Sequence, residues 1–131
     1  MKNNVVIAIF LMFSYCENFT QNLNSEKQLH SNWEFQKKGD KKWYMATVPG
    51  CVHTDLMDNG ILKDPYYRLN ESKAQWVDKE DWVYKSTFSL KENEYKKQHH
   101  EIKFEGLDTY ASVYLNDSLI LQSNNMHRTY I

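Results

Sequence analysis

The stretch WVYKSTFSL, residues 82–90, decides the fold class of this 131-residue chain. Apolar and polar side chains alternate along it, and this two-residue period is typical of a half-buried β-strand. One face of the predicted strand carries Trp82, Tyr84, Phe88 and Leu90, and the other carries Lys85, Thr87 and Ser89. We therefore expect this strand to supply several aromatic side chains to a hydrophobic core.

Two further segments toward the C-terminus have the same character. Residues 101–107, EIKFEGL, repeat the alternation, which predicts a strand with Ile102 and Phe104 pointing inward. Residues 110–122, YASVYLNDSLILQ, are typical of a β-hairpin that turns at Asn116-Asp117, because these residue types tolerate the positive φ of a tight turn. The charged residues between the strands, KENEYKKQHH, are expected to form a loop.

The N-terminal half predicts one more hairpin, in which residues 33–36 and 42–48 flank a turn at Gly39-Asp40. The chain thus has about six short strands, rich in aromatic and β-branched residues, and no long helix. This pattern favours an all-β protein with a jelly-roll β-sandwich. A jelly roll has about eight strands, and the chain ends at Tyr130-Ile131 in a strand just begun. We therefore expect the sandwich to be incomplete at the C-terminus.

Between these hairpins lies the irregular stretch VPGCVHTDLMDNGILKDPYYRLNE, residues 48–71. Its prolines and glycines exclude one long helix or strand, yet it holds too many apolar residues for a solvated linker. Long ordered loops in compact domains are usually functional or cover a core. We expect a short helix that starts near His53-Thr54-Asp55 and ends at Gly60, followed by a turn at Asp64-Pro65.

The first residues have the layout of a secretory signal peptide, residues 1–16, in which Lys2 precedes an apolar run and small residues precede a cleavage site at Glu17. The run is about half of the ~20 residues that a membrane-spanning helix needs, which favours a cleaved signal over an uncleaved anchor. Residues 17–31 are expected to form a flexible lead-in, and residues 32–131 the partial β-sandwich.

The charge pattern and the glycosylation sequons are consistent with a protein of the secretory pathway. The net charge is −1, and the two signs are interspersed, so no basic surface for nucleic acid and no polybasic membrane patch is expected. Asn-x-Ser/Thr sequons at Asn18, Asn70 and Asn116 are candidate glycosylation sites in a secretory-pathway protein.

The sequence shows no motif that indicates a metal site, a cofactor site or a catalytic nucleophile. The five histidines, His30, His53, His99, His100 and His127, show no metal-ligand spacing, so no metal site is expected. No glycine-rich phosphate loop and no nucleophile elbow is present, and no cofactor is expected. Cys51 remains alone once the signal is removed, which excludes a disulfide-stapled domain. We interpret Cys51 as a small buried hydrophobic residue.

A more suggestive group combines carboxylates, amides and aromatic rings. Sugars offer hydroxyls for hydrogen bonds to such polar groups and apolar faces that stack on rings, and concave sites that combine both suit them. The group consists of Asp64, Tyr66, Asn70, Glu71, Trp76, Asp81 and Trp82. The alternative is that the tryptophans belong to the core, while Asp81 and Asn70 serve as turn or cap residues. The spacing leaves both interpretations open.

These motifs together resemble the N-terminal domain of the β-mannosidases of glycoside hydrolase family 2, from about Trp33 to the end of the chain. The motif Gly106-Leu107-Asp108-Thr109, with Ala111, Val113 and Leu115-Asn116, is similar to family 2 sugar-binding domains generally. The mannosidase branch is indicated by Val48-Pro49-Gly50, His53-Thr54-Asp55-Leu56, Asp64-Pro65-Tyr66, Asn70-Glu71, Asp81-Trp82 and Met126-His127-Arg128.

The resemblance implies a galactose-binding-like sandwich in a large lysosomal or secreted enzyme. Such an enzyme removes terminal β-linked mannose from oligosaccharides, with retention and without a cofactor. Its two catalytic glutamates would lie in a downstream (β/α)8 barrel, so we expect no catalytic residue and no activity in this chain alone. The resemblance also implies that the sandwich packs beside the barrel and helps to wall the substrate pocket. The residues implied are Asn70, Glu71, Asp81, Trp82, Asn125, His127 and Arg128.

Two other hypotheses stay open beside this one. The first is another family 2 exo-β-glycosidase, such as a β-glucosaminidase-like enzyme, which would share the sandwich. The second is a non-catalytic carbohydrate-binding module that stands alone. The barrel residues around the glutamates would separate the two enzymes, whereas a stand-alone module would require a complete sheet.

Overall fold

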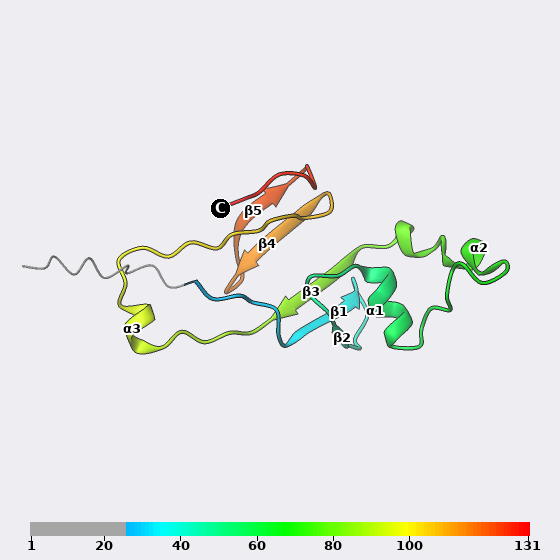
Figure 1. The fold of residues 1–131 in the computed structure, drawn as a ribbon, viewed down its shortest axis with the longest axis horizontal. Helices are drawn as coiled ribbons and strands as arrows, with labels where there is room; N and C mark the ends of the chain where they lie inside the picture. Colours follow the sequence, from blue (N-terminus) through cyan, green and yellow to red (C-terminus); the bar gives the residue numbers. More distant parts are fainter. Residues whose placement is uncertain (1–25) are drawn as a thin grey trace, which may run out of the picture.

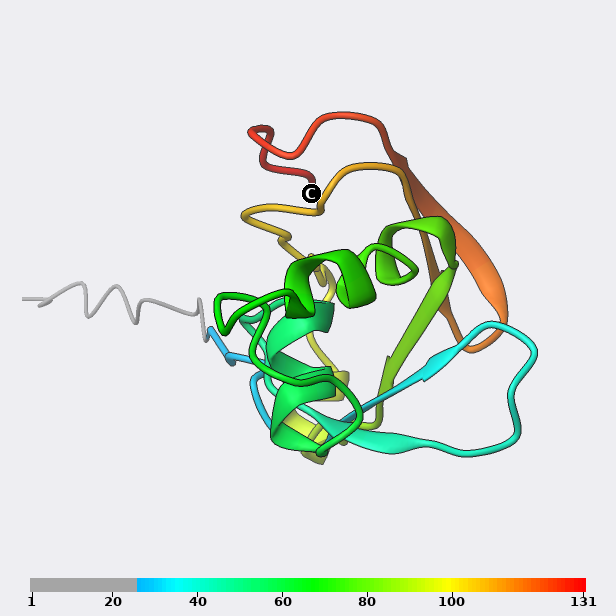
Figure 2. The ribbon, with the colours of Figure 1, turned by 90° about the vertical axis from the view of Figure 1, so that its right-hand side faces the viewer.

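The computed structural model describes residues 26–131, so the predicted signal peptide and the first part of the lead-in lie outside the described residues. In chain order the elements are β1 (Trp33–Lys37), β2 (Tyr44–Ala46), α1 (Val52–Asp58), α2 (Asn70–Ala74), the 3-10 helix η1 (Val77–Lys79), β3 (Trp82–Ser86), α3 (Glu92–Tyr95), β4 (Ala111–Leu115) and β5 (Ser118–Ser123). The strands form an antiparallel sheet of order β2-β1-β3 and a separate β4-β5 hairpin. Figure 1 shows the hairpin above the three-stranded sheet, and Figure 2 shows α1 and the hairpin to either side of β3.

Both predicted hairpins are present. The first joins β1 to β2 through a turn in which Gly39 has a φ of +91° and the Asp40 amide donates to the Lys37 carbonyl at 3.0 Å. The second joins β4 to β5 through Asn116 and Asp117, with φ of 48° and 64°. Positive φ at both central residues matches the right-handed twist of the paired strands, which explains why the turn residues predicted the hairpin correctly.

The hydrophobic core lies on one face of the three-stranded sheet. Phe35, at the centre of β1, is fully buried, and its ring stacks on Tyr84 of β3 at a centroid distance of 5.5 Å. Tyr44 and Trp82 pack at 5.9 Å to either side. The other side of this core is closed by Leu56, Leu62, Ala74 and Val77, all of which come from residues 52–79. The irregular stretch between the hairpins therefore covers the core.

The predicted short helix in this stretch is α1, with Cys51 as its N-terminal cap. The Cys51 amide donates to the Thr54 hydroxyl at 3.4 Å, and Gly60, with a φ of +70°, follows the helix end. The interpretation of Cys51 as a buried hydrophobic residue was wrong, because the side chain is exposed at this cap. Just before the helix, a Cβ on Gly50 would collide with the Thr47 carbonyl oxygen.

A buried carboxylate fixes α1 to the sheet. Asp55 is only 1% exposed. One of its oxygens accepts a hydrogen bond from the Thr47 amide at 2.8 Å, and the other accepts one from the Tyr84 hydroxyl at 2.7 Å. The side-chain amide of Asn59 adds a contact from the helix end to the Met45 carbonyl at 2.9 Å. A carboxylate buried among apolar residues is stable only with such partners.

The strand predicted over residues 82–90 is shorter than expected. It ends at Ser86, because its partner β1 begins at Trp33, which pairs with Ser86. Beyond that point Phe88 and Leu90 are 42% and 41% exposed, so the assignment of Phe88 to the core was wrong. The alternation correctly placed Trp82 and Tyr84 toward the core, but a period in the sequence carries no information about where the partner strand stops.

The strand predicted over residues 101–107 is also absent as such. Within the described residues, Phe104 makes a single antiparallel bridge with Tyr130, with N···O distances of 2.9 and 3.0 Å. Ile102 and Phe104 are half-buried while Lys103 and Glu105 are exposed, so the alternation of burial is correct. The charged segment before it contains the one-turn helix α3 instead of an entirely irregular loop.

We expect the two phenylalanines to differ sharply in their contribution to stability. Phe35→Ala should lower the free energy of unfolding by about 3–5 kcal/mol, the usual range for a buried phenylalanine. Phe88→Ala should cost much less, because its ring is partly in water. Chemical denaturation followed by tryptophan fluorescence would measure both. Equal losses would show that Phe88 is buried in solution.

We also expect a specific loss of stability in alkaline solution. Burial, and then the hydrogen bond to Asp55, raise the pKa of Tyr84 above its ordinary value of about 10. A group whose pKa is raised by folding stabilises the fold below its unfolded pKa, and this contribution is lost as the pH rises above about 10. Tyr84→Phe should therefore show a shallower loss of stability above that pH than the parent protein. Tyr95→Phe, an exposed position on α3, is the matched control, and parallel curves for parent and Tyr84→Phe would contradict the assignment.

Candidate functional site

The first group of candidate residues lies in the loop that leads into α2. The Asp64 carboxylate accepts a hydrogen bond from the Tyr66 amide at 2.9 Å, and the backbone carbonyl of Asp64 accepts one from the Tyr67 amide at 3.2 Å. These bonds confirm the turn predicted at Asp64-Pro65. The side-chain amide of Asn70 donates to the same carbonyl at 3.0 Å. Asn70 therefore holds the loop from the first residue of α2, while the Glu71 side chain is exposed beside it.

The second group is Asp81 with Trp82 at the start of β3. Asp81 is exposed and makes an ion pair with Lys38 at 3.0 Å. The Trp82 indole N–H donates to the Val77 carbonyl at 3.0 Å, and its ring packs against Phe35 and Trp76 at centroid distances of 5.9 Å. Of the two interpretations left open, the structure supports a core position for Trp82, with Asp81 at the surface beside it.

The third group follows β5. The Asn125 side-chain oxygen accepts a hydrogen bond from the His127 amide at 2.9 Å. The Tyr130 hydroxyl accepts hydrogen bonds from the amides of Asn124 and Asn125, each at 3.2 Å, and donates to the Asn125 carbonyl at 3.3 Å. The Arg128 guanidinium lies 5.6 Å from the centre of the Tyr130 ring. Tyr130, which was not among the predicted site residues, is thus the residue that shapes this loop.

These three groups do not form one constellation. Figure 1 shows α2 and the loop after β5 in separate parts of the molecule. Within residues 26–131, no hydrogen bond, ion pair or ring contact joins the Asn70-Glu71 pair to the loop that carries Asn125, His127 and Arg128.

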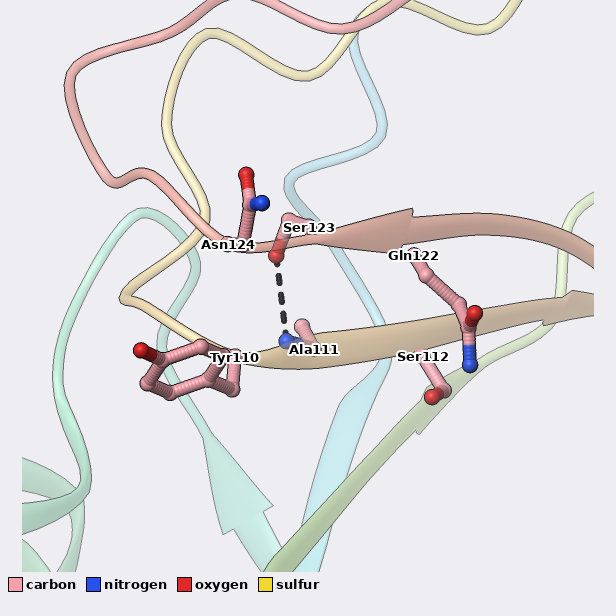
Figure 3. Close-up of a pocket in the computed structure, with 6 residues that line it drawn as sticks. All are labelled: Tyr110, Ala111, Ser112, Gln122, Ser123 and Asn124. Carbon is pink, nitrogen blue, oxygen red and sulfur yellow. Dashed lines mark hydrogen bonds between the residues drawn. The ribbon is translucent and has the colours of Figure 1, made fainter.

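The structure has a hollow that the sequence did not indicate. A hollow of about 510 Å³ lies over one end of the β4-β5 hairpin. Figure 3 draws its lining residues, Tyr110, Ala111, Ser112, Gln122, Ser123 and Asn124. The signal for it is the strand register, because Ser112 lies opposite Gln122 and Ala111 opposite Ser123. Of these residues, Tyr110, Ala111, Ser112 and Gln122 lie in the predicted hairpin, and none was predicted to be a site residue.

The described sequons differ in their surroundings. Asn116 lies exposed at the tip of the β4-β5 hairpin. Asn70 is half-buried, and its side-chain nitrogen, the atom that a glycan would modify, is engaged with Asp64. The third sequon, Asn18, lies outside the described residues.

Reactive groups outside these regions are few. The hydrogen bond with the Thr54 hydroxyl lowers the pKa of the Cys51 thiol, which is exposed. His53 lies 3.7 Å from the Asp78 carboxylate. Between residues 26 and 131, no cluster of histidine, cysteine and acidic side chains is arranged to hold a metal ion. The helices in that part of the chain are too short or too polar to cross a membrane.

The structure consists mainly of two antiparallel sheets, and residues 52–79 cover the core of the larger one. This fold is a galactose-binding-like β-sandwich. Residues 33–131 match the family model described as glycosyl hydrolase 2 galactose-binding domain-like. The chain belongs to this family, and both the predicted fold class and the resemblance to family 2 are confirmed.

Similar proteins point to one branch of the family. The chain is 38% identical over 102 residues to a β-mannosidase of Bos taurus and 40% identical over 112 residues to β-mannosidase B of Emericella nidulans, covering 78% and 82% of this chain but only 12% and 13% of those proteins. The crystal structure of a β-D-mannosidase from Dictyoglomus thermophilum superposes with a TM-score of 0.76 at 44% identity, over 78% of this chain and 13% of that one. The chain thus spans about an eighth of the length of these relatives.

Proposed function

We propose that this chain is the N-terminal domain of a β-mannosidase that removes terminal β-D-mannose from the non-reducing ends of oligosaccharides. The main support for the proposal is the likeness to the Dictyoglomus thermophilum β-D-mannosidase. Over the same part of the chain, the two proteins are similar both in sequence, at 44% identity, and in fold, with a TM-score of 0.76. The likeness to mammalian and fungal β-mannosidases supports it.

In this proposal the domain supports the reaction instead of performing it. A retaining glycosidase needs two carboxyl groups about 5–5.5 Å apart, one as acid/base and one as nucleophile. We assign those groups to a barrel domain in a longer polypeptide, which makes that domain the partner of the sandwich. The chemistry requires no metal or cofactor, because a carboxylic acid protonates the leaving group and a carboxylate attacks the sugar.

The longest polypeptide that contains this chain should hydrolyse an aryl β-mannoside, and residues 17–131 alone should not. The anomer that forms first should be β-mannose, as retention requires, and proton NMR during the first turnovers would detect it. An aryl β-N-acetylglucosaminide is the matched substrate. Preference for the glucosaminide would favour the alternative family 2 glycosidase, and turnover by residues 17–131 would contradict the assignment of the glutamates.

We propose that separate parts of this domain contribute to the pocket wall, namely Asn70 and Glu71, Asp81 with the core residue Trp82, and Asn125, His127 and Arg128. Exposed polar groups such as Glu71 and Arg128 suit hydrogen bonds to sugar hydroxyls. In the active polypeptide, Glu71→Ala or Arg128→Ala should lower kcat/KM for the aryl β-mannoside at least about tenfold, or ~1.4 kcal/mol of transition-state stabilisation. The matched control is Tyr95→Ala, which removes an exposed side chain on α3. Unchanged kinetics in both variants, with an intact fold, would remove these residues from the pocket.

We further propose a secretory route to the lysosome or the cell exterior. The support is the charge and apolar layout of residues 1–16 and the three sequons. The mature protein should begin at Glu17, and N-terminal sequencing of secreted or lysosomal material would test this. Asn116 should carry a glycan, because its side chain is exposed at a turn, whereas Asn70 should stay unmodified. An intact Met1 in a cytosolic pool would contradict the route, and mass spectrometry of both sequons would test the glycans.

A further inference from the structure

We propose that the hollow over the β4-β5 hairpin is a second, non-catalytic sugar site that binds a neutral pyranose unit of an oligosaccharide or mannan chain. Its contacts are Tyr110, Ser112 and Gln122, with Asn124 at the rim. None of these residues belongs to the proposed pocket wall. The inference rests on the proposed function only for the identity of the sugar.

The strand register creates this surface. Ser112 of β4 lies opposite Gln122 of β5, and neighbouring side chains on a strand point to opposite faces. Ser112 therefore shares one face with Gln122, while Ala111 and Ser123 lie on the other, and Tyr110 directly precedes β4 and lines the same hollow. Figure 3 shows the Ser112 and Gln122 side chains on the same side of the ribbon, with the Tyr110 ring beside the start of β4. The hairpin thus sets an aromatic ring, a hydroxyl and an amide along one surface.

The hydrogen-bonding groups on this face are available to a ligand. Ser123, on the opposite face, is buried, accepts a hydrogen bond from the Ala111 amide at 3.0 Å and donates to the Thr109 carbonyl at 3.0 Å. In contrast, the side chains of Tyr110, Ser112 and Gln122 make no hydrogen bond, ion pair or ring contact with the rest of residues 26–131. The hollow therefore offers donors and acceptors that the fold itself does not use.

The chemistry of the hollow fits an uncharged sugar. Tyr110 is 86% exposed, so its ring can stack on the C–H face of a pyranose. The Gln122 amide offers both a donor and an acceptor to adjacent hydroxyls, and the Ser112 hydroxyl can play either role. The lining carries no charged side chain, so it is complementary to a neutral ligand and not to a phosphate or an acidic sugar. Its volume, about 510 Å³, lies within the roughly 300–1,000 Å³ range of small-molecule sites.

The position of the hollow suggests how it serves the enzyme. Its rim residue, Asn124, immediately precedes Asn125 of the proposed pocket wall, and the Tyr130 hydroxyl accepts hydrogen bonds from the amides of both. An oligosaccharide whose end lies near Asn125 can continue over the hairpin. The hollow would then contact sugar units beyond the terminal one and would raise affinity for longer chains.

Affinity electrophoresis tests this inference. The whole polypeptide is run in native gels that contain increasing β-1,4-linked mannan, and the dissociation constant follows from its retardation. Tyr110→Ala and Gln122→Ala should each weaken binding about tenfold or more, equivalent to ~1.4 kcal/mol. Tyr110→Phe should keep most of the affinity, because the ring is retained. Tyr95→Ala, which removes a tyrosine that is 73% exposed on α3, should bind like the parent protein.

The outcomes distinguish a sugar site from a contact surface within the polypeptide. Equal retardation of the parent protein, Tyr110→Ala and Gln122→Ala overturns the inference. So does a Tyr110→Ala variant with a lower melting temperature and unchanged mannan affinity, because the face is then a contact with another part of the polypeptide. Hydrolysis of a small aryl β-mannoside should be the same in Tyr110→Ala and the parent protein. A parent protein that binds mannan but does not hydrolyse the aryl β-mannoside would refute the proposed function and leave the sugar site standing.

Discussion

The carboxylate of Asp55 is the constraint on which the described structure depends. It joins α1 to Thr47, the residue after β2, and to Tyr84 in the middle of β3, which is 29 residues away in the sequence. A buried carboxylate costs free energy unless charge-assisted or strong hydrogen bonds offset the loss of water. Here the Thr47 amide and the Tyr84 hydroxyl supply them, so the helix has one favourable position on the sheet.

This anchor explains how an irregular segment can cover a core. Residues 48–79 contain only short helices, which are marginal on their own because few hydrogen bonds offset the cost of nucleation. Asp55 fixes the first of these helices, α1, to the sheet. The segment then buries four apolar side chains at intervals along its length, those of Leu56, Leu62, Ala74 and Val77. Between these points the loop is free to present exposed side chains such as Tyr66 and Glu71.

The sequence predicts correctly those features that neighbouring residues determine. Both hairpins were predicted correctly, because Gly39 and the Asn116-Asp117 pair adopt the positive φ that their turns require. The predicted strands were wrong at Phe88 and over residues 101–107, because the length of a strand depends on where its partner strand begins and ends. The role of Asp55 was missed for a related reason: its partner Tyr84 is 29 residues away. The hollow beside Tyr110 depends on register, which composition does not reveal.

The two faces of the β4-β5 hairpin have different chemistry, and this difference bears on what each can contact. One face carries Tyr110, Ser112 and Gln122. Leu115 and Leu121, on the other face, line a hollow of about 420 Å³ together with Phe104 and Ile131. Aliphatic walls of this kind suit another protein surface, which gains by excluding water. A face of unused amide and hydroxyl groups would lose its hydrogen bonds to water under such a cover. A sugar can replace those bonds with its own hydroxyls, so the polar face is the better surface for a sugar and the apolar face is the better surface for another protein surface.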